Sequence, residues 1–303
     1  HRFRMIIMPD CVDFDGAAAW ANSPGSTSYL MSMYASLPVT QVHEFGHNLG
    51  HKHSGKDGVR YADDTGYMGN RATWSDEGSM MCFNPAKMWV FGWYSEWHRT
   101  VNVLNVGFSG QLVGINDAKN QPNIVSDNGQ YVFLRLKSGK SRLFIAFNQK
   151  KGINEGVVGD GDKIVITEQD GRFTESVWKA GLGVGEIFEY WNWNGSGKTL
   201  VVENCGIRFG SPDYAHIIAY TRGSTDVSCP EVTVNHNTPN NDVYYAPPPV
   251  ARLCESTEKW WYDIDGEGFN CDWYSQSNRC RQLGNQFENF GMTANEACCA
   301  CLS

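Results

Sequence analysis

The stretch VTQVHEFGHNLGHKHSG, residues 39–55, holds four of the eight histidines in the chain. At about 100° per residue, Val42, Phe45 and Leu49 fall on one apolar stripe, which predicts an amphipathic helix that packs against a sheet. His43 and His47 then lie side by side on another face, one turn apart. Two imidazoles at this spacing can bind one metal ion while the helix stays docked through its apolar stripe.

A glycine follows this helix at the point where the chain must turn back. Gly50 can adopt the left-handed conformation that ends a helix, so that His53 reaches the same point as His43 and His47. The full pattern is His-Glu-x-x-His-x-x-Gly-x-x-His, and a helix with ordinary surface histidines explains neither its Glu nor its Gly. His51 lies outside the pattern. We expect it to face solvent or to support a ligand, with competition for the metal as the alternative.

Three neutral imidazoles with an open fourth position are typical of a catalytic zinc site rather than a structural one. Zinc lowers the pKa of a bound water to about 7, and a neighbouring carboxylate can take the proton as the water attacks a carbonyl. Glu44 is the candidate for this general base. The motif therefore predicts one catalytic Zn2+ and metal-assisted hydrolysis, most naturally of a peptide bond. A second metal is not supported, because GDGDK at residues 159–163 lacks the later ligands of a calcium loop and favours a hairpin turn.

The composition excludes two classes of partner. The 303 residues include 25 basic and 33 acidic side chains, a net charge of -8, and no Lys/Arg-rich run, so a nucleic-acid partner is not expected. No apolar run reaches the roughly 18 to 20 residues of a membrane span. No feature of the sequence indicates an oligomeric state.

Cysteine usage indicates the compartment. Six of the ten cysteines fall within residues 254–303, a density that predicts a disulfide module and a secreted, extracellular protein. A zinc knuckle on the CCAC ending is disfavoured, because no histidine lies nearby.

Composition and residue patterning change along the chain, and these changes predict an α+β fold organised in four parts. Residues 1–98 mix an apolar strand with the histidine helix and form the expected catalytic domain. Residues 99–229 consist of short β-forming runs divided by turns, which predicts a β-sandwich or barrel. Residues 230–253 are rich in Asn and Pro and read as a linker, and 254–303 form the cysteine-rich module.

The motif resembles that of the metzincin clan of zinc peptidases. YADDTGYMGN at residues 61–70, followed by CFNPAKMWVFGWY at 82–94, resembles the gametolysin family of secreted algal metallopeptidases that degrade cell wall or matrix. This resemblance, which extends back to MPDCVDFDGAAAW at residues 8–20, implies a metzincin catalytic domain with Met68 as its Met-turn; Met80 and Met81 are the less favoured candidates. It also implies an endopeptidase acting on proteins or glycoproteins of extracellular matrix or cell wall.

Departures from the clan pattern lead to further expectations. Matrix metalloproteinases are the nearest competitor, but their Met-turn follows the third histidine more closely than Met68 follows His53. Only 42 residues precede His43, so part of the N-terminal subdomain is expected to lie outside this sequence. Asn70 stands where some members carry a metal-binding tyrosine, which Tyr61 or Tyr67 could replace. By analogy with the clan, residues 80–93 would shape the pocket for the residue after the scissile bond.

The C-terminal module resembles the ShK-toxin-like (ShKT) domain, in particular versions from diatoms and related marine protists. The resemblance implies three disulfides, Cys254–Cys301, Cys271–Cys298 and Cys280–Cys299. Its eight acidic against three basic residues argue against channel blocking and favour docking to a wall polymer or substrate, with a structural cap as the alternative. The other four cysteines are simplest paired as Cys205–Cys229 and Cys11–Cys82. Asn194 begins the one N-glycosylation sequon considered, a weak signal.

Two other functions fit the same residues. An extracellular binding or adhesion protein could use an inactive metzincin scaffold to carry the ShKT-like module. A zinc hydrolase could instead act on non-peptide ester or amide bonds, because zinc hydroxide attacks several classes of carbonyl. Cleavage that depends on Glu44 separates the enzyme from the binding protein.

Overall fold

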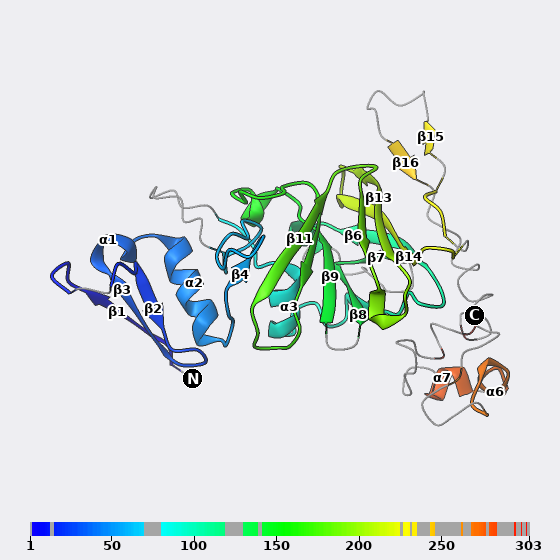
Figure 1. Ribbon diagram of the computed structural model, residues 1–303, viewed down its shortest axis with the longest axis horizontal. Helices are drawn as coiled ribbons and strands as arrows, with labels where there is room; N and C mark the ends of the chain where they lie inside the picture. The colour runs from blue at the N-terminus through cyan, green and yellow to red at the C-terminus, as the bar shows by residue number, and fades with distance from the viewer. Residues whose placement is uncertain are drawn as a thin grey trace.

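The computed structural model describes residues 2–12, 15–69, 80–118, 130–138, 141–224, 227–230, 232–234, 243–245, 262, 268–276, 279–283, 294, 298 and 301. Figure 1 shows a small N-terminal sheet with helix α2 beside a larger β-rich region. In the described part of the chain, no helix is long and apolar enough to cross a membrane.

The N-terminal sheet has three strands in the order β1-β3-β2. Strand β1 (Arg4–Met8) pairs in parallel with β3 (Thr27–Met31), and β2 (Ala19–Ala21) pairs with β3 in antiparallel fashion. The short helix α1 (Ser32–Ala35) leads into α2 (Pro38–Asn48), which has proline in its first turn. Helix α2 packs against β2 and β3, and the Phe45 ring contacts the Phe3 ring with 4.8 Å between centroids. The predicted helix is therefore confirmed; of its apolar stripe, Phe45 packs on the residue before β1, whereas Val42 packs against the cluster that contains Met68.

The β-rich region consists of two sheets that share one core. The first has the order β4-β11-β10-β9-β8-β5 and the second the order β12-β13-β14-β6-β7. The first sheet contains β4 (Ser54–Gly55), β5 (His98–Val101), β8 (Phe133–Ser138), β9 (Ser141–Phe147), β10 (Ile164–Glu168) and β11 (Ser176–Leu182). The second contains β6 (Phe108–Val113), β7 (Gln130–Tyr131), β12 (Ile187–Tyr190), β13 (Leu200–Arg208) and β14 (Tyr214–Thr221). Alternate residues of both sheets, such as Ile145 and Ile217, are fully buried between them, so the region is a β-sandwich.

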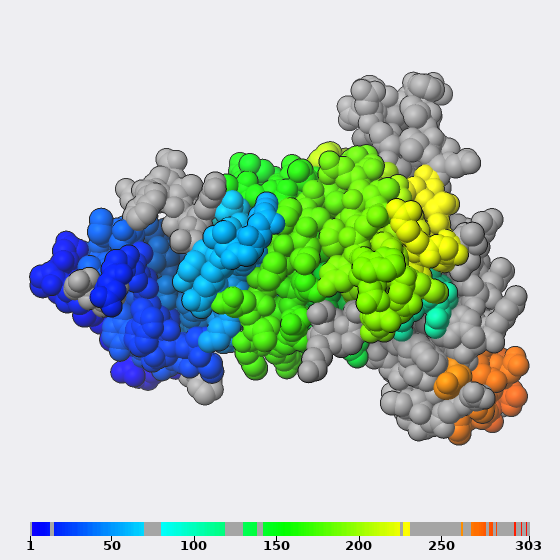
Figure 2. Space-filling view, in the orientation of Figure 1, coloured from blue at the N-terminus to red at the C-terminus, as the bar shows by residue number. Residues whose placement is uncertain are grey.

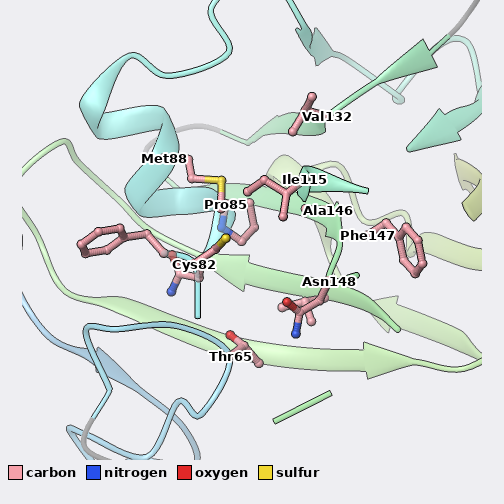
Figure 3. A pocket seen from close by; sticks show the side chains of 12 residues that line it. Thr65, Cys82, Pro85, Met88, Ile115, Val132, Ala146, Phe147 and Asn148 are labelled. Carbon is pink, nitrogen blue, oxygen red and sulfur yellow. The ribbon is translucent and has the colours of Figure 1, made fainter. Parts of the chain in front are cut away.

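Helices and turns complete this region. Helix α3 (Pro85–Phe91) covers the outer face of the first sheet, and α4 (Ile115–Ala118) follows β6. Two 3-10 turns occur at Gly152–Asn154 and Trp193–Gly195. Between α3 and the sheet lies a cavity of about 20 Å3, whose lining includes Cys82, Pro85 and Met88 (Figure 3). Such a volume holds about one water molecule, so this cavity is no substrate site.

The packing does not break at the expected domain boundary near residue 98. Strand β4 pairs in parallel with β11, and β5 pairs in parallel with β8. A second buried cluster joins Met68 and Met88 to Phe133 and Phe144. Figure 2 shows the light-blue part of the chain, around residues 55–69, lying directly against the green β-rich region. Residues 54–69 and 80–98 therefore pack with the sandwich, because β4 and β5 extend its first sheet and side chains of these segments join the cluster on its outer face.

The disulfides correct part of the expected pairing. Disulfides join Cys205 to Cys229, Cys271 to Cys298, and Cys280 to Cys301. The first two are the expected pairs, but the expected Cys280–Cys299 and Cys254–Cys301 pairs are wrong. The Cys301 N–H donates to the Cys298 carbonyl, so these two cysteines lie close together while each forms a disulfide with a different partner. Cys254 and Cys299 lie outside the described residues.

The expected Cys11–Cys82 disulfide does not form. Cys11 is exposed in the turn after β1, whereas Cys82 is half-buried beside α3, on the outer face of the sandwich.

Only parts of the linker and the C-terminal module are described. Within residues 230–253, β15 (Val232–Val234) and β16 (Val243–Tyr245) form an antiparallel pair, so this stretch includes regular secondary structure. The module contains α6 (Cys271–Tyr274) and α7 (Arg279–Leu283), packed on a small core that includes the buried Tyr274.

Candidate metal centre

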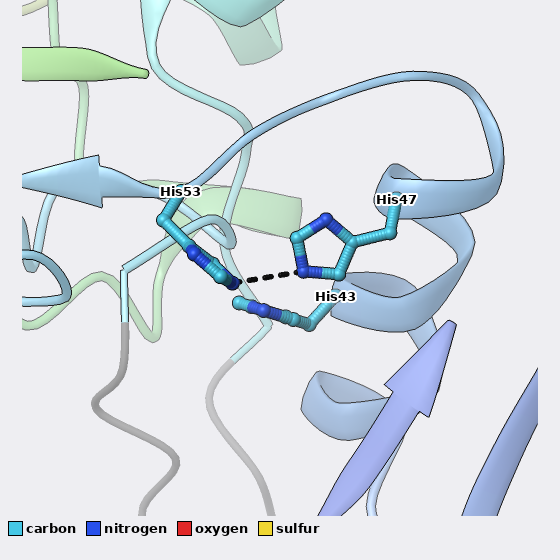
Figure 4. A group of neighbouring side chains, drawn as sticks. All are labelled: His43, His47 and His53. Atoms are coloured by element: carbon cyan, nitrogen blue, oxygen red, sulfur yellow. Dashed lines mark hydrogen bonds between the residues drawn. The ribbon is translucent and has the colours of Figure 1, made fainter. Parts of the chain in front are cut away.

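The three predicted ligands meet at one point. His43 and His47 project from α2, and His53 reaches them from the chain that enters β4 (Figure 4). One ring nitrogen of each residue lies within 4.8 Å of the others, and within the described residues this is the single group with metal-ligand geometry. Gly50 has φ 96°, and the His51 N–H donates to the Gly46 carbonyl, so a left-handed glycine ends the helix as expected.

Backbone carbonyls fix the proton positions on the two helical histidines. The Nδ1 of His43 lies 2.7 Å from the Tyr67 carbonyl, and the Nδ1 of His47 lies 2.8 Å from the His51 carbonyl. A carbonyl only accepts, so each Nδ1 carries the proton and each Nε2 keeps a bare lone pair. This arrangement orients metal-binding imidazoles in proteins.

The ligand nitrogens lie close together at the centre. His47 Nε2 and His53 Nε2 are 2.9 Å apart, a hydrogen-bond distance, so one of the two nitrogens carries a proton that a bound metal ion would replace. Burial lowers the pKa of His43 to about 4 and holds the pKa of His47 and His53 below the usual range. All three rings are therefore neutral at pH 7, the state in which imidazole binds metal. Three neutral nitrogens form a donor set that zinc prefers.

Glu44 is buried next to the first ligand. Only 6% of it is exposed, and its Oε2 has no hydrogen-bond partner among the described residues. Burial raises the pKa of this carboxyl to about 7. A carboxyl with such a pKa exchanges a proton readily at neutral pH, as a general base requires.

The turn containing Met68 lies directly beneath α2. Met68 is 1% exposed, and a Cβ built on Gly46 would lie 2.6 Å from its sulfur. The same turn supplies the Tyr67 carbonyl to His43, and the Met68 carbonyl accepts the Ser54 N–H at 2.8 Å. The turn therefore supports the helix from below and fixes the chain that follows His53.

The two tyrosines considered near the metal differ. The Tyr61 ring packs against the His53 ring at 4.1 Å, whereas the Tyr67 hydroxyl accepts the Met81 N–H at 3.2 Å. Tyr61 is thus the one that borders the histidines. Asn70 lies outside the described residues.

His51 does not face solvent, contrary to one expectation. It is 1% exposed, and its ring packs edge-on against Phe91 with centroids 3.9 Å apart. Burial lowers the pKa of His51 to about 3. Its ring is not part of the metal-ligand group, but its carbonyl orients His47, so its supporting role is carried by the backbone. Phe83 and Phe91, which enclose the ring, come from a distant segment that no local pattern connects with the helix.

The remaining candidate positions lie elsewhere. The segment 159–163 forms turns in the connection from β9 to β10, and the Asp160 carboxylate accepts hydrogen bonds from Trp178 and Lys163. Asn194 is exposed in the second 3-10 turn.

Comparison with known proteins bears on the N-terminal part. The family model described as gametolysin peptidase M11 matches residues 2–118, which include all three histidines, Glu44 and Met68. No curated protein and no solved structure matches the chain. The family match supports the gametolysin relationship of this part and indicates a metallopeptidase, in which His43, His47 and His53 are the candidate zinc site.

Proposed function

We propose that the chain is a secreted zinc-dependent endopeptidase that hydrolyses proteins or glycoproteins of extracellular matrix or cell wall. One observation carries the proposal: three neutral imidazoles converge at one point, and the buried carboxylate of Glu44 belongs to the residue that follows the first of them, inside the segment matched by a peptidase family. His43, His47 and His53 would hold the metal.

The side chains divide the chemistry between them. When bound, Zn2+ supplies an acidified water and polarises the substrate carbonyl. Glu44 takes the proton of the attacking water and returns it to the leaving amine, and its raised pKa suits both transfers. The Tyr67 and His51 carbonyls keep two imidazoles in the tautomer that presents Nε2. Met68 forms the apolar floor below the helix.

Residues 80–93 are proposed to shape the pocket for the substrate residue after the scissile bond. Phe91 and Trp93 stack with centroids 4.4 Å apart, and Phe83 packs edge-on against Phe91. Trp93 is 47% exposed, so this aromatic group reaches the surface. An aromatic wall of this kind would favour large apolar substrate side chains.

An extracellular location is consistent with the three disulfides found among the described residues, because such bonds persist in oxidising compartments. The C-terminal module, which we propose to be ShKT-like, would dock the enzyme to a wall polymer or to its substrate. Asn194, on an exposed turn, is a candidate for glycosylation.

The test compares wild type with Glu44→Gln and with Glu155→Gln, a matched change at an exposed carboxylate in the sandwich. Zinc content is measured by mass spectrometry, and casein and gelatin cleavage by release of fluorescent peptides. We expect one zinc per chain in all three proteins. Glu44→Gln should lose about 100-fold or more of the activity, because it cannot accept the proton, and Glu155→Gln should lose none.

Two results would contradict this proposal. A wild-type protein that binds zinc but cleaves neither protein, and instead retains binding to cell-wall material, would be the adhesion protein. Glu44-dependent cleavage of ester or amide substrates alone would identify a non-peptide hydrolase.

A further inference from the structure

The third ligand differs from the other two in how it is held. Helix α2 spaces His43 and His47, and backbone carbonyls fix their Nδ1 protons. His53 follows the helix on a turn, and its buried Nδ1 has no hydrogen-bond partner among the described residues. Its position therefore depends on the backbone at residues 53–55 and on packing against Tyr61.

The main chain of residues 53–55 is hydrogen-bonded to strand β11 of the β-sandwich. The Ser176 N–H, at the start of β11, donates to the His53 carbonyl at 3.1 Å. Strand β4 begins at the next residue and pairs in parallel with β11, with Ser54 opposite Ser176. The His53 main chain is thus hydrogen-bonded to a distant strand, in which Ser176 lies 122 positions after its partner Ser54.

A buried side-chain network closes the same junction. Ser54, Asp63 and Ser176 are 0% exposed and Asn84 is 2% exposed. The Ser54 hydroxyl donates to Asp63 Oδ2 at 2.5 Å and lies 2.7 Å from the Ser176 hydroxyl. The Asn84 amide nitrogen, which carries two protons, lies within hydrogen-bond distance of three acceptors: the Ser54 hydroxyl at 2.8 Å, Asp63 Oδ2 at 2.9 Å and the Ser176 hydroxyl at 3.2 Å.

Donor counting gives the network one direction. Ser54 uses its single proton on Asp63, so the Ser176 hydroxyl must donate to Ser54. The other Asp63 oxygen accepts both the N–H and the hydroxyl of Thr65, at 2.9 and 2.5 Å. The buried Asp63 carboxylate thereby links the segment after His53, the turn containing Met68 and the β-sandwich. Hydrogen bonds to a charged group are stronger than those between neutral groups.

We infer that the β-rich region contributes directly to the metal centre. Ser176 is a positioning residue for the ligand His53. It acts through Ser54, together with Asn84 and Asp63. This inference rests on the proposed zinc function. The hydrogen-bonded junction between β4 and β11 would hold His53 in position before the metal binds. An appended binding module would not contribute to the metal centre in this way.

The network also contributes to stability, so the test must separate stability from positioning. Ser176→Ala removes the two buried hydrogen bonds that its hydroxyl makes with Ser54 and Asn84 next to His53. Ser109→Ala removes a partly buried hydroxyl hydrogen bond, between Ser109 and His216 at 3.0 Å, in the other sheet. Both variants of the full chain should lose thermal stability, Ser176→Ala the more, and the comparison is made on folded protein.

Zinc affinity distinguishes them, measured by competition with a chromophoric chelator, with the visible spectrum of the Co2+-loaded protein as a geometric readout. We expect Ser176→Ala to bind zinc about 10- to 100-fold more weakly and to change the Co2+ spectrum, as loss of ligand-supporting contacts does elsewhere. Ser109→Ala should match wild type in both. Equal zinc affinity in a folded Ser176→Ala protein would overturn the inference, whereas a wild type that binds no zinc would overturn the proposed function instead.

A measurement on the wild type covers the case in which Ser176→Ala does not fold. In the metal-free protein, amide hydrogen exchange is followed in peptides covering residues 53–55 and 174–177. We expect both peptides to be protected before zinc is added, since the junction is built without metal. Free exchange that becomes slow only after zinc addition would show that the metal orders His53, and would refute the inference.

Discussion

Gly46→Ala tests whether α2 rests on Met68. Gly46 lies inside α2, between the two helical ligands. A Cβ at this position would lie 2.6 Å from the Met68 sulfur and 3.2 Å from Phe83 Cε1. Both neighbours are buried, so the new methyl group must displace a side chain that has little space to move.

Two opposing terms set the size of the effect. Alanine is favoured over glycine inside a helix by about 1 kcal/mol. Overpacking a buried contact costs about 1 to 3 kcal/mol. The substitution should therefore destabilise the wild type by about 0 to 2 kcal/mol. In a Met68→Ala background the sulfur is gone, and the same substitution should stabilise the protein by up to about 1 kcal/mol.

The assay is a double-mutant cycle by urea unfolding of the metal-free protein at pH 7.5. Four proteins are compared: wild type, each single variant and the double variant. Contacting residues are expected to show non-additive changes in the free energy of unfolding. If Gly46→Ala stabilises both backgrounds equally, the helix does not rest on Met68 and the assignment of the Met-turn is refuted.

Three further outcomes are expected. Burial lowers the pKa of Lys87 to about 7, so between pH 7 and 10.5 the unfolded chain binds more protons and stability rises with pH, by up to about 1.4 kcal/mol per unit. Urea unfolding at pH 7, 8 and 9 should show this rise relative to Lys87→Met, and parallel curves would contradict it. Replacing Cys205 and Cys229 by serine opens a bridge spanning 24 positions. This change should cost about 3 to 4 kcal/mol in thermal unfolding; an unchanged midpoint would count against a structural disulfide. The exposed Cys11 should react with maleimide in the native, unreduced protein, detected by peptide mass; a native protein that resists labelling there would show Cys11 to be protected.

Local features of the centre could be predicted from the sequence. Helical periodicity places His43 and His47 together, and the left-handed Gly50 follows from a residue type that tolerates that conformation. The short β-forming runs likewise indicate the strands of the sandwich. These features depend on neighbours within a few residues, which is the range that a single sequence reports.

Features that depend on distant partners could not be predicted. The pairing of β4 with β11 joins the segment that follows His53 to the sandwich, yet β4 is two residues long and carries no periodic signal. The burial of His51 depends on Phe83, which lies just before α3, and on Phe91, the last residue of α3. The pairing of Cys280 with Cys301 joins residues 21 positions apart, and the spacing of the cysteines alone does not select it among the possible pairs.

The hydrogen bond between the Ser54 and Ser176 hydroxyls also implies an order in which parts of the metal centre form while the chain is synthesised. A nascent chain that has emerged only as far as residue 118 carries every residue of the histidine motif but not β11. Contacts across 122 positions form late, since a long loop must close before they are gained. The centre would thus be completed only when most of the sandwich has been made, so that unfinished chains would hold zinc weakly and the peptidase would mature together with its scaffold.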